Sequence, residues 1–494
     1  MNHSTVLRPM KISNIDVDAA LANVRQQLQA DTTVAPSMRT AIELLIVLVQ
    51  ILSGRINTHS ANSSKPPSQD PNRPRQNRLK SGRKPGGQPG RVGKTLQPVV
   101  DPDAIQRVKV DRRTLPKGGA FRVVGFEKRQ VVDLDIRRFV TEYQAEILEN
   151  AQGQRFVAPF PVGVERSVQY GPQLKAHAVY LSQYQLLPYD RIREYFEDQV
   201  GIPLSVGSLF NFNQDAFNKA AEFEPWVKDR LAEASVVHAD ETGVNIGGQR
   251  HWLHGASNDR LTWLAPHAQR GQQAMNAIGI LPRFNGVLCH DHWKPYYRYS
   301  CLHSLCNAHH LRELQRAWEQ DKQVWAQRMQ TLLNIMTDSV DDAGGCLPPD
   351  KAQRWRKVYR RCLANAQKEC PPPDESQRQG KPGRLKRTRA RNLLERLIAY
   401  EADALRLLDN PEGPFTNNQG ERDIRMFKVQ QKISGCFRSF EGAEIFCRVR
   451  SYLSTARKQN VSASKALMHL FEGSVPPFMA VGAGNDTTVL NQTS

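Results

Sequence analysis

The chain has 494 residues, too many for a single hydrophobic core, so two to four domains are expected. Hydrophobic residues make up 39% of it, enough for most of its length to fold. The formal net charge of +19 predicts a polyanionic partner, and nucleic acid is favoured over a membrane surface. No run approaches the ~20 apolar residues of a spanning helix, so we expect no membrane partner.

Two features predict a cytoplasmic protein. The first thirty residues contain Asp16, Asp18 and polar interruptions, so they do not form a secretory signal. All eight cysteines lie at or after Cys289, and none stands in a CxxC pair. We therefore expect reduced thiols rather than disulfides or zinc ribbons.

Residues 1–59 are predicted to form helices. An amphipathic helix fits residues 16–30, and Pro36 opens a second one. In the second helix, apolar residues alternate at spacings of three and four, which is the seam of a two-heptad coiled coil: Ile42, Leu45, Val49, Leu52 and Ile56. Other apolar residues widen this face, so a packed core helix is as good an interpretation as a dimer zipper.

Residues 60–98 are rich in Ser, Pro, Gly, Asn and Gln and carry many basic residues against the single acid Asp70. Such a segment cannot bury enough apolar surface to fold. It is predicted to be a disordered basic linker whose side chains, Arg83 and Lys84 among them, contact DNA phosphates. A solvated tether is the alternative.

Two modules are predicted next. Residues 99–165 contain short alternating apolar runs and no cysteine, and they predict a small β module without zinc. Residues 166–232 are predicted to be helical, and Gly201 followed by a helix capped by Ser205 outlines a helix-turn-helix. The DNA-contacting residues would then be Ser208, Asn211 and Asn213. A plain helical bundle is the alternative.

Residues 235–297 contain two short apolar runs that end on Asp240 and Asp291 and are predicted to be buried strands. Between them we expect a hairpin across Asn258-Asp259 and a helix over residues 272–281. Carboxylates at adjacent strand ends suit Mg²⁺, which prefers oxygen ligands. Ordinary strand-end or capping aspartates are the alternative.

A further strand is predicted to lead into a helix that starts near Asn307, followed by a helical insertion over residues 311–410. A basic cluster late in the insertion, Lys381 with residues 384–391, predicts either a contact with the DNA backbone or a solvated helix face. Residues 473–494 are expected to be disordered.

A third polar segment, residues 415–432, predicts a helix capped by Asn417 or Asn418, with Glu421 in its first turn. Cations follow along neighbouring faces: Arg425, Lys428 and Lys432. A carboxylate beside a row of cations suits a site for metal and phosphodiester. An ordinary capped helix with an internal ion pair is the alternative.

Three other acids are weaker candidates. Glu241 should point to the opposite side of the strand from Asp240. Asp423 lies about 200° round the helix from Glu421, so the two cannot share a face. Asp259 fits a turn residue.

Taken together, these segments resemble the transposases of the insertion sequence 66 family, which have an RNase H-like core. The resemblance covers about residues 40 to 470 and is carried by His238-Ala-Asp-Glu-Thr-Gly243, Asp291-His-Trp-Lys-Pro-Tyr296, Cys306-Asn-Ala-His-His-Leu-Arg-Glu-Leu314, Thr416-Asn-Asn-Gln-Gly-Glu-Arg-Asp-Ile-Arg425, Lys432-Ile-Ser-Gly-Cys-Phe-Arg438 and Asn62-Ser-Ser-Lys-Pro-Pro67. It implies a mixed α/β RNase H-like catalytic domain, residues 233–310 and 411–472, with a large helical insertion and preceded by helical and small β modules.

The resemblance also implies the chemistry of a DDE transposase. Asp240, Asp291 and Glu421 would hold two Mg²⁺ or Mn²⁺ ions ~3.5–4 Å apart. Water would nick the terminal inverted repeats of the transposon, and the freed 3′-hydroxyl would attack target DNA. His309 would approach the metals or the leaving group, or else pack as a core histidine. The expected phosphate contacts are Arg422, Arg425, Lys428 and Lys432.

Partners and alternatives follow from the same resemblance. Synapsis of two ends implies a homo-oligomer, and elements of the family often encode companion proteins. Family members commonly carry cysteine pairs before the catalytic domain, where zinc is implied. Residues 99–165 have no cysteine, so the resemblance predicts no zinc site there. One alternative function is a DNA-binding protein without catalysis. The other is a metallohydrolase with ligands that favour zinc or iron: His238, His290, His292, His309 and His310.

Overall fold

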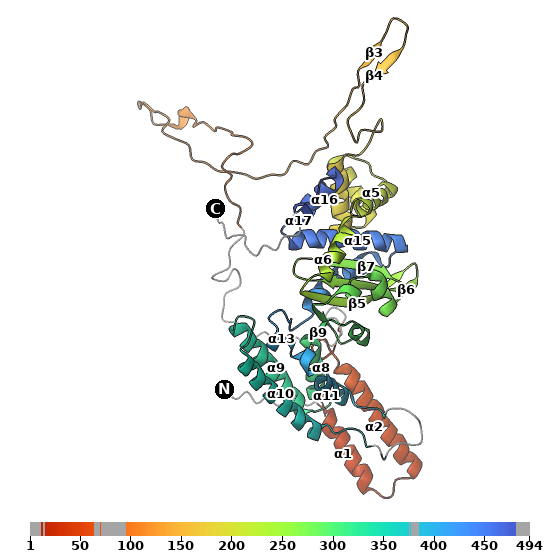
Figure 1. The fold of residues 1–494 in the computed structure, drawn as a ribbon. Coiled ribbons are helices and arrows are strands. Elements are labelled where there is room, and N and C mark those ends of the chain that lie inside the picture. Colours follow the sequence, from red (N-terminus) through yellow and green to blue (C-terminus); the bar gives the residue numbers. More distant parts are fainter. Residues whose placement is uncertain are drawn as a thin grey trace.

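The structure is a computed structural model, and it describes residues 11–12, 15–63, 70, 95–374, 376 and 385–480 (Figure 1). Three segments named above lie outside the described residues. They are most of the predicted linker (residues 64–69 and 71–94, with Arg83 and Lys84), Lys381 and Arg384 of the basic cluster, and residues 481–494.

A five-stranded mixed sheet with the order β7-β6-β5-β8-β9 forms the centre of the fold. β5, β6 and β7 form an antiparallel meander, whereas β8 runs parallel to β5 and β9 runs parallel to β8. The predicted hairpin, helix and final strands are confirmed. Their bounds are β5 Val236–Ile246, β6 Gln249–Ser257, β7 Thr262–His267, α7 Gln272–Ile278, β8 Val287–His290 and β9 Leu302–Leu305.

β5 differs from the prediction because it does not end at Asp240. It continues to Ile246 and turns into β6 at Gly247 and Gly248, whose φ angles of +58° and +82° suit glycine. Asp240 pairs with Gly255 in the β6 register. The polar residues after Asp240 are kept in the strand by pairing along the whole length of β6.

Helix α15 (Phe440–Lys458) packs along β7 and satisfies its free edge. The hydroxyl of Thr455 accepts a hydrogen bond from the Thr262 N–H at 3.0 Å, and that of Ser451 accepts one from the Leu264 N–H at 2.9 Å. These bonds occupy donors that an edge strand would otherwise expose.

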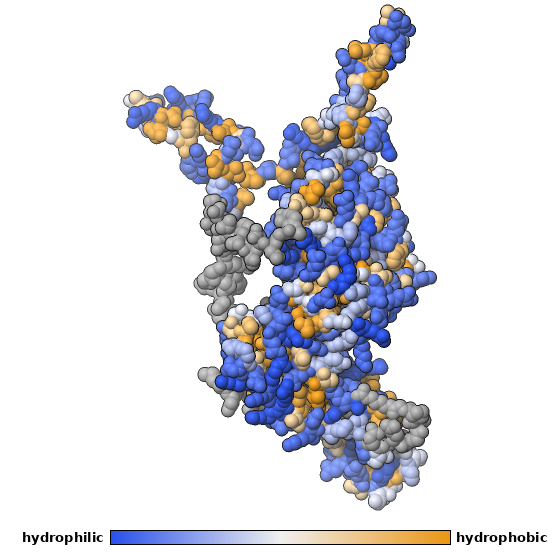
Figure 2. Space-filling model, in the orientation of Figure 1, coloured by the Kyte–Doolittle hydropathy of each residue, from blue (hydrophilic) through white to orange (hydrophobic). Residues whose placement is uncertain are grey.

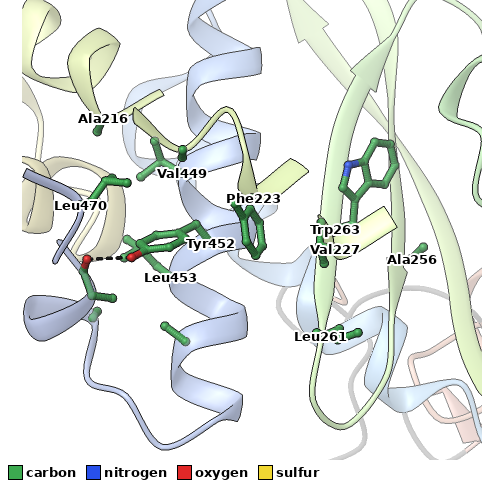
Figure 3. Close-up of a cluster of buried hydrophobic side chains, with 14 of the residues drawn as sticks. Ala216, Phe223, Val227, Ala256, Leu261, Trp263, Val449, Tyr452, Leu453 and Leu470 are labelled. Carbon is green, nitrogen blue, oxygen red and sulfur yellow. Dashed lines mark hydrogen bonds between the residues drawn. The ribbon is translucent and has the colours of Figure 1, made fainter. Parts of the chain in front are cut away.

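The main hydrophobic core lies between α15, the sheet and a group of helices that come from before β5 and after α15 (Figure 3). Phe223 and Val227 pack there with Tyr452, whose hydroxyl donates to the Ala466 carbonyl at 2.8 Å. The helices are α3 Pro172–Val179, α4 Tyr189–Tyr195, α5 Val206–Lys219, α6 Phe223–Ala232, α16 Ala463–Glu472 and α17 Pro477–Ala480, with π-helical turns at Tyr180–Tyr184 and Phe196–Val200.

Residues 473–480 are more ordered than predicted. In α17, Phe478 is buried, and its ring lies 5.9 Å from that of Trp226. The expected disorder over residues 473–494 is therefore wrong for the residues as far as Ala480, because an aromatic side chain there completes the core.

The predicted insertion is helical and has a second core of its own, with Trp325, Tyr359 and Leu394 fully buried. This block lies next to β9, whereas α15 lies along β7 at the other edge of the sheet (Figure 1). Its helices are α8 Asn307–Glu319, α9 Val324–Asp342, α10 Pro349–Glu369, α11 Arg389–Ala399, α12 Glu401–Ala404 and α13 Arg406–Asp409.

The N-terminal segment forms two short strands, β1 (Lys11–Ile12) and β2 (Ile15–Asp16), then a helical hairpin of α1 (Val17–Ala30) and α2 (Pro36–Ile56). The α2 seam is largely uncovered, since Leu45 is 59% and Leu52 55% exposed. The packed-core interpretation of α2 is therefore wrong.

Among the described residues, α2 alone is long and apolar enough to cross a membrane, which corrects the expectation that no run reaches that length. A single helix of this kind is weak evidence for a span.

The chain after α2 docks on the helical insertion. The Asn62 side chain, 1% exposed, donates to Glu319 at 2.7 Å, and Gln320 donates to the Asn57 carbonyl at 3.1 Å.

Residues 99–165 do not form the predicted β module. Their one strand pairing is the hairpin of β3 (Ile147–Glu149) and β4 (Arg155–Val157), with a 3-10 turn at Arg112–Thr114. Hydrophobic side chains stay exposed along both projecting arms, as in Val131 at 92% and Phe139 at 90% (Figure 2). The apolar runs are too short and too interrupted by charge to bury one another.

Candidate active site

Two neighbouring parallel strands place Asp240 and Asp291 side by side. β5 pairs with β8 from Val236 opposite Val287 to His238 opposite Cys289, and the same register extended by two residues puts Asp240 level with Asp291. β8 ends at His290, so Asp291 lies just past the last pair. Both carboxylates therefore emerge where β8 stops and β5 continues.

The loop after β8 fixes the Asp291 side chain. Its Oδ1 accepts a hydrogen bond from the Trp293 N–H at 3.0 Å. His292 has a φ of +74°, an unusual value for a residue with a Cβ. The His292 N–H donates to His290 Nδ1 at 3.1 Å, which holds this sharp turn.

Glu421 comes from the first turn of α14 (Asn418–Ser434), which packs across β5 and β6. Gly255 of β6, the partner of Asp240, permits this approach, because a Cβ there would lie only 3.0 Å from Ile424 Cδ1. The helix thus lies directly over the part of the sheet that carries Asp240.

Asn417 attaches the start of α14 to β5, a role that the sequence did not predict. It occupies the N-cap position, but its side chain does not cap the helix. Its Oδ1 accepts from His238 Nδ1 at 2.9 Å, and its Nδ2 donates to the Ala239 carbonyl at 2.8 Å. Gly420 leaves room for this side chain, since a Cβ there would lie 3.0 Å from Asn417 Oδ1.

Asp240 is buried among other acids. Burial raises the pKa of Asp240 well above its ordinary value, and the carboxylates of Glu241, Asp291 and Glu421 raise it further. Like charges this close favour the protonated acid unless a cation shares the site.

Glu241 and Asp423 have other partners. Glu241 accepts from Arg270 and from the Tyr296 hydroxyl, each at 2.6 Å, and burial raises its pKa. Asp423 pairs with Lys458 at 2.7 Å. Asp259 lies in the turn between β6 and β7.

Helix α8 brings two more groups to Glu421. His309 Nδ1 lies 3.8 Å and Arg312 Nη2 3.6 Å from Glu421 Oε1. Burial, followed by the charge of Arg312, lowers the pKa of His309. With Cys306, His309 and Glu421 offer ligand atoms within 4.8 Å of one another.

The predicted DNA-contacting residues are only partly accessible. Arg422, Arg425 and Lys432 on α14 and Asn211 on α5 are exposed, and Ser208 is half-buried. Lys428 instead donates to the Gly243 carbonyl at 2.5 Å, so it joins α14 to β5. Asn213 is 1% exposed and bonds to the Ser182 and Tyr189 hydroxyls, so it cannot contact DNA as predicted.

The five histidines of the metallohydrolase alternative do not come together as a ligand set. His238 is bonded to Asn417, His290 Nε2 lies 3.1 Å from His303 Nδ1, and His310 Nδ1 lies 2.9 Å from Asn307 Oδ1. Of the five, His309 alone belongs to a group that could hold a metal ion within the described part of the chain.

The structure defines a mixed α/β protein in which two parallel strands and a helix carry Asp240, Asp291 and Glu421, and the last two carboxylates both raise the pKa of the first. A family model for the transposase IS66 family matches residues 167–445, more than half of the chain. The protein belongs to this family. It is therefore a transposase, with the nuclease and transferase activity on DNA that membership implies.

A second family model, for a family of unknown function (DUF6444), matches residues 11–97. No curated protein matches the sequence.

Proposed function

We propose that Asp240, Asp291 and Glu421 form the catalytic DDE triad of this transposase. In the first step, water bonds to the phosphorus at a transposon end, and the bond from phosphorus to the 3′-oxygen breaks. In the second, the freed 3′-hydroxyl bonds to a target phosphorus, and the target 3′-oxygen leaves. The observation that carries the proposal is the β5–β8 register, which puts Asp240 level with Asp291. Burial and Glu241, and then Asp291 and Glu421, raise the pKa of Asp240.

We infer that the catalytic domain is RNase H-like. The support is the sheet order, in which a three-stranded antiparallel meander continues through its first strand, β5, into the parallel strands β8 and β9. The first carboxylate is on β5, the second follows β8, and the third is on a helix that packs over the sheet.

The donor set fits hard divalent cations. Burial and the neighbouring carboxylates raise the pKa of Asp240, so its charged form needs a nearby cation. Glu421 Oε1 is buried without a hydrogen-bond partner among the described residues. When bound, two Mg²⁺ or Mn²⁺ ions would activate the attacking oxygen and stabilise the leaving oxygen. Asp240, Asp291 and Glu421 would hold these ions together, so the three carboxylates would not all have to bind the same ion.

The chain's own residues prepare this site. Asp240, whose pKa is raised by burial and by neighbouring carboxylates, would release its proton to hold a cation. The turn at His292 orients Asp291, and Asn417 orients the helix that carries Glu421. Asn211 and Ser208 on α5, and Arg422, Arg425 and Lys432 on α14, contact the DNA, together with Arg83 and Lys84 of the linker.

Strand cleavage of a labelled transposon end in Mg²⁺ tests the proposal. Asp240→Asn, Asp291→Asn and Glu421→Gln should each lower the nicking rate by about 10³-fold, since metal-ion catalysis supplies several kcal/mol of transition-state stabilisation. Asp259→Asn, in the β6–β7 turn, is the matched control and should nick at the wild-type rate. Unchanged nicking by any triad variant contradicts the assignment.

Retained DNA binding by Asp240→Asn separates a catalytic defect from lost recognition. If the wild-type protein binds transposon ends but never nicks them, the protein is a DNA-binding protein without catalysis.

We also propose that the protein assembles as a homo-oligomer through the α2 seam. The support is the exposure of Leu45 and Leu52 on a helix with heptad spacing. Leu45→Asp with Leu52→Asp should lower the mass measured by light scattering to that of one chain, whereas Glu43→Asp should not. An unchanged mass places the contact elsewhere.

A further inference from the structure

Three side chains of different chemistry lie close together, and one of them, Glu421, also belongs to the proposed triad. Cys306 is the N-cap of α8, His309 lies in the first turn of that helix, and Glu421 faces them from α14. Their ligand atoms, one sulfur, one nitrogen and one oxygen, lie within 4.8 Å of one another. The described part of the chain holds one such group of His, Cys, Asp or Glu side chains.

The chemistry of this group does not suit Mg²⁺. A thiolate and an imidazole favour thiophilic cations such as Zn²⁺, which binds sulfur, nitrogen and oxygen tetrahedrally. Zinc–ligand bonds of ~2.0–2.3 Å place neighbouring ligand atoms about 3.5 Å apart. His309 Nδ1 and Glu421 Oε1 are 3.8 Å apart, close to that separation.

An independent observation points to a ligand at this place. His309 Nδ1 and Glu421 Oε1 are both buried, and neither has a hydrogen-bond partner among the described residues. Buried polar atoms without partners are costly, and a shared cation would satisfy both. Cys306 Sγ accepts only weak bonds, such as that from the Asn417 N–H at 3.1 Å. Arg312, 3.6 Å from Glu421 Oε1, opposes the cation and must turn away when it binds.

We propose that Cys306, His309 and Glu421 bind one thiophilic divalent cation of the Zn²⁺ type, and that this ion withdraws Glu421 from the Mg²⁺ site. Binding transfers the Cys306 proton to solvent and uses neutral His309. The binding site rests on the geometry of these three residues alone. The competition with Mg²⁺ rests on the proposed function, because it needs Glu421 in the triad.

Co²⁺, a spectroscopic substitute for Zn²⁺, tests the binding site in the full-length protein without any activity measurement. Titration should give visible bands of a tetrahedral ion and thiolate-to-cobalt charge-transfer absorption, saturating at one ion per chain and removed by Zn²⁺. Cys306→Ser should abolish the charge-transfer band and weaken binding more than about 100-fold, beyond the 10–100-fold cost of losing an outer-shell partner.

Two cysteine variants are the matched controls: Cys301→Ser removes another buried thiol, and Cys346→Ser removes an exposed one. Both should keep the band. His309→Gln keeps the thiol and should still weaken binding, so the test survives if Cys306→Ser fails to fold. No band in the wild type, or a band that persists in folded Cys306→Ser, overturns the site.

Nicking in saturating Mg²⁺ then tests the competition. Zn²⁺ at the concentration that displaces Co²⁺ should reduce wild-type nicking at least tenfold. Each variant is compared with its own nicking rate in Mg²⁺ alone. Nicking by Cys306→Ser should not be inhibited by Zn²⁺. Equal inhibition of both proteins overturns the competition. If the wild type does not nick at all, the proposed function fails, while the cobalt spectrum still decides the site.

Discussion

Removal of the Asn417 side chain should displace Glu421 while the rest of the protein stays folded. Asn417→Ala deletes two buried hydrogen bonds, at 2.9 Å from His238 and at 2.8 Å to the Ala239 carbonyl. Each bond contributes about 0.5–1.5 kcal/mol, and each buried partner left unsatisfied costs about 1–3 kcal/mol. Relaxation and water entry recover part of this, so the expected loss is about 2–4 kcal/mol.

Such a loss leaves a folded protein if the total stability is about 5–15 kcal/mol. Urea unfolding followed by circular dichroism measures it. Nicking should fall further than the folded fraction does, because the first turn of α14 is no longer held against β5. Asn418→Ala, at the exposed neighbouring position, is the control and should change stability by less than about 0.5 kcal/mol. Equal stability and equal nicking of the two variants would refute this role of Asn417.

Three other outcomes are expected. Gly255→Ala should cost about 1–3 kcal/mol in urea unfolding, because its Cβ would crowd Ile424, and adding Ile424→Val should recover part of that loss. Lys428→Ala should lower stability rather than DNA affinity in a gel-shift assay, since its ammonium donates to the Gly243 carbonyl. The raised pKa of Asp240 means that the metal-free folded state binds a proton more tightly than the unfolded state. Stability without divalent ions should therefore fall as the pH rises from the ordinary carboxyl pKa through the raised value. Mg²⁺ should restore the melting temperature of the wild type but not of Asp240→Asn, and a flat pH profile would contradict the shift.

The local pattern of the central domain was predictable because it follows from neighbouring residues. Apolar runs located β5 and β8, the Asn258-Asp259 pair located the turn before β7, and Ser205 located the start of α5. The family motifs identified the transposase, since they preserve residue type and spacing, which need no coordinates.

Features that depend on distant partners were not predictable. β5 continues past Asp240 because β6 pairs with its polar residues, and nothing in the local pattern shows that pairing. Residues 99–165 alternate like strands, but their short apolar runs find no surface to cover. Lys428 looked like a phosphate ligand because its bond to β5 is made across a long sequence separation.

The sequence by itself determined the family of the protein, its candidate acidic residues and the succession of its central strands along the chain. Tertiary structure alone decided that Asp240 lies level with Asp291, that Asn417 joins helix to strand, and that Cys306 and His309 lie close to Glu421 of another helix. The physical reason is that hydrogen-bond partners and charge repulsion depend on distance in space, which a linear pattern of residues does not specify.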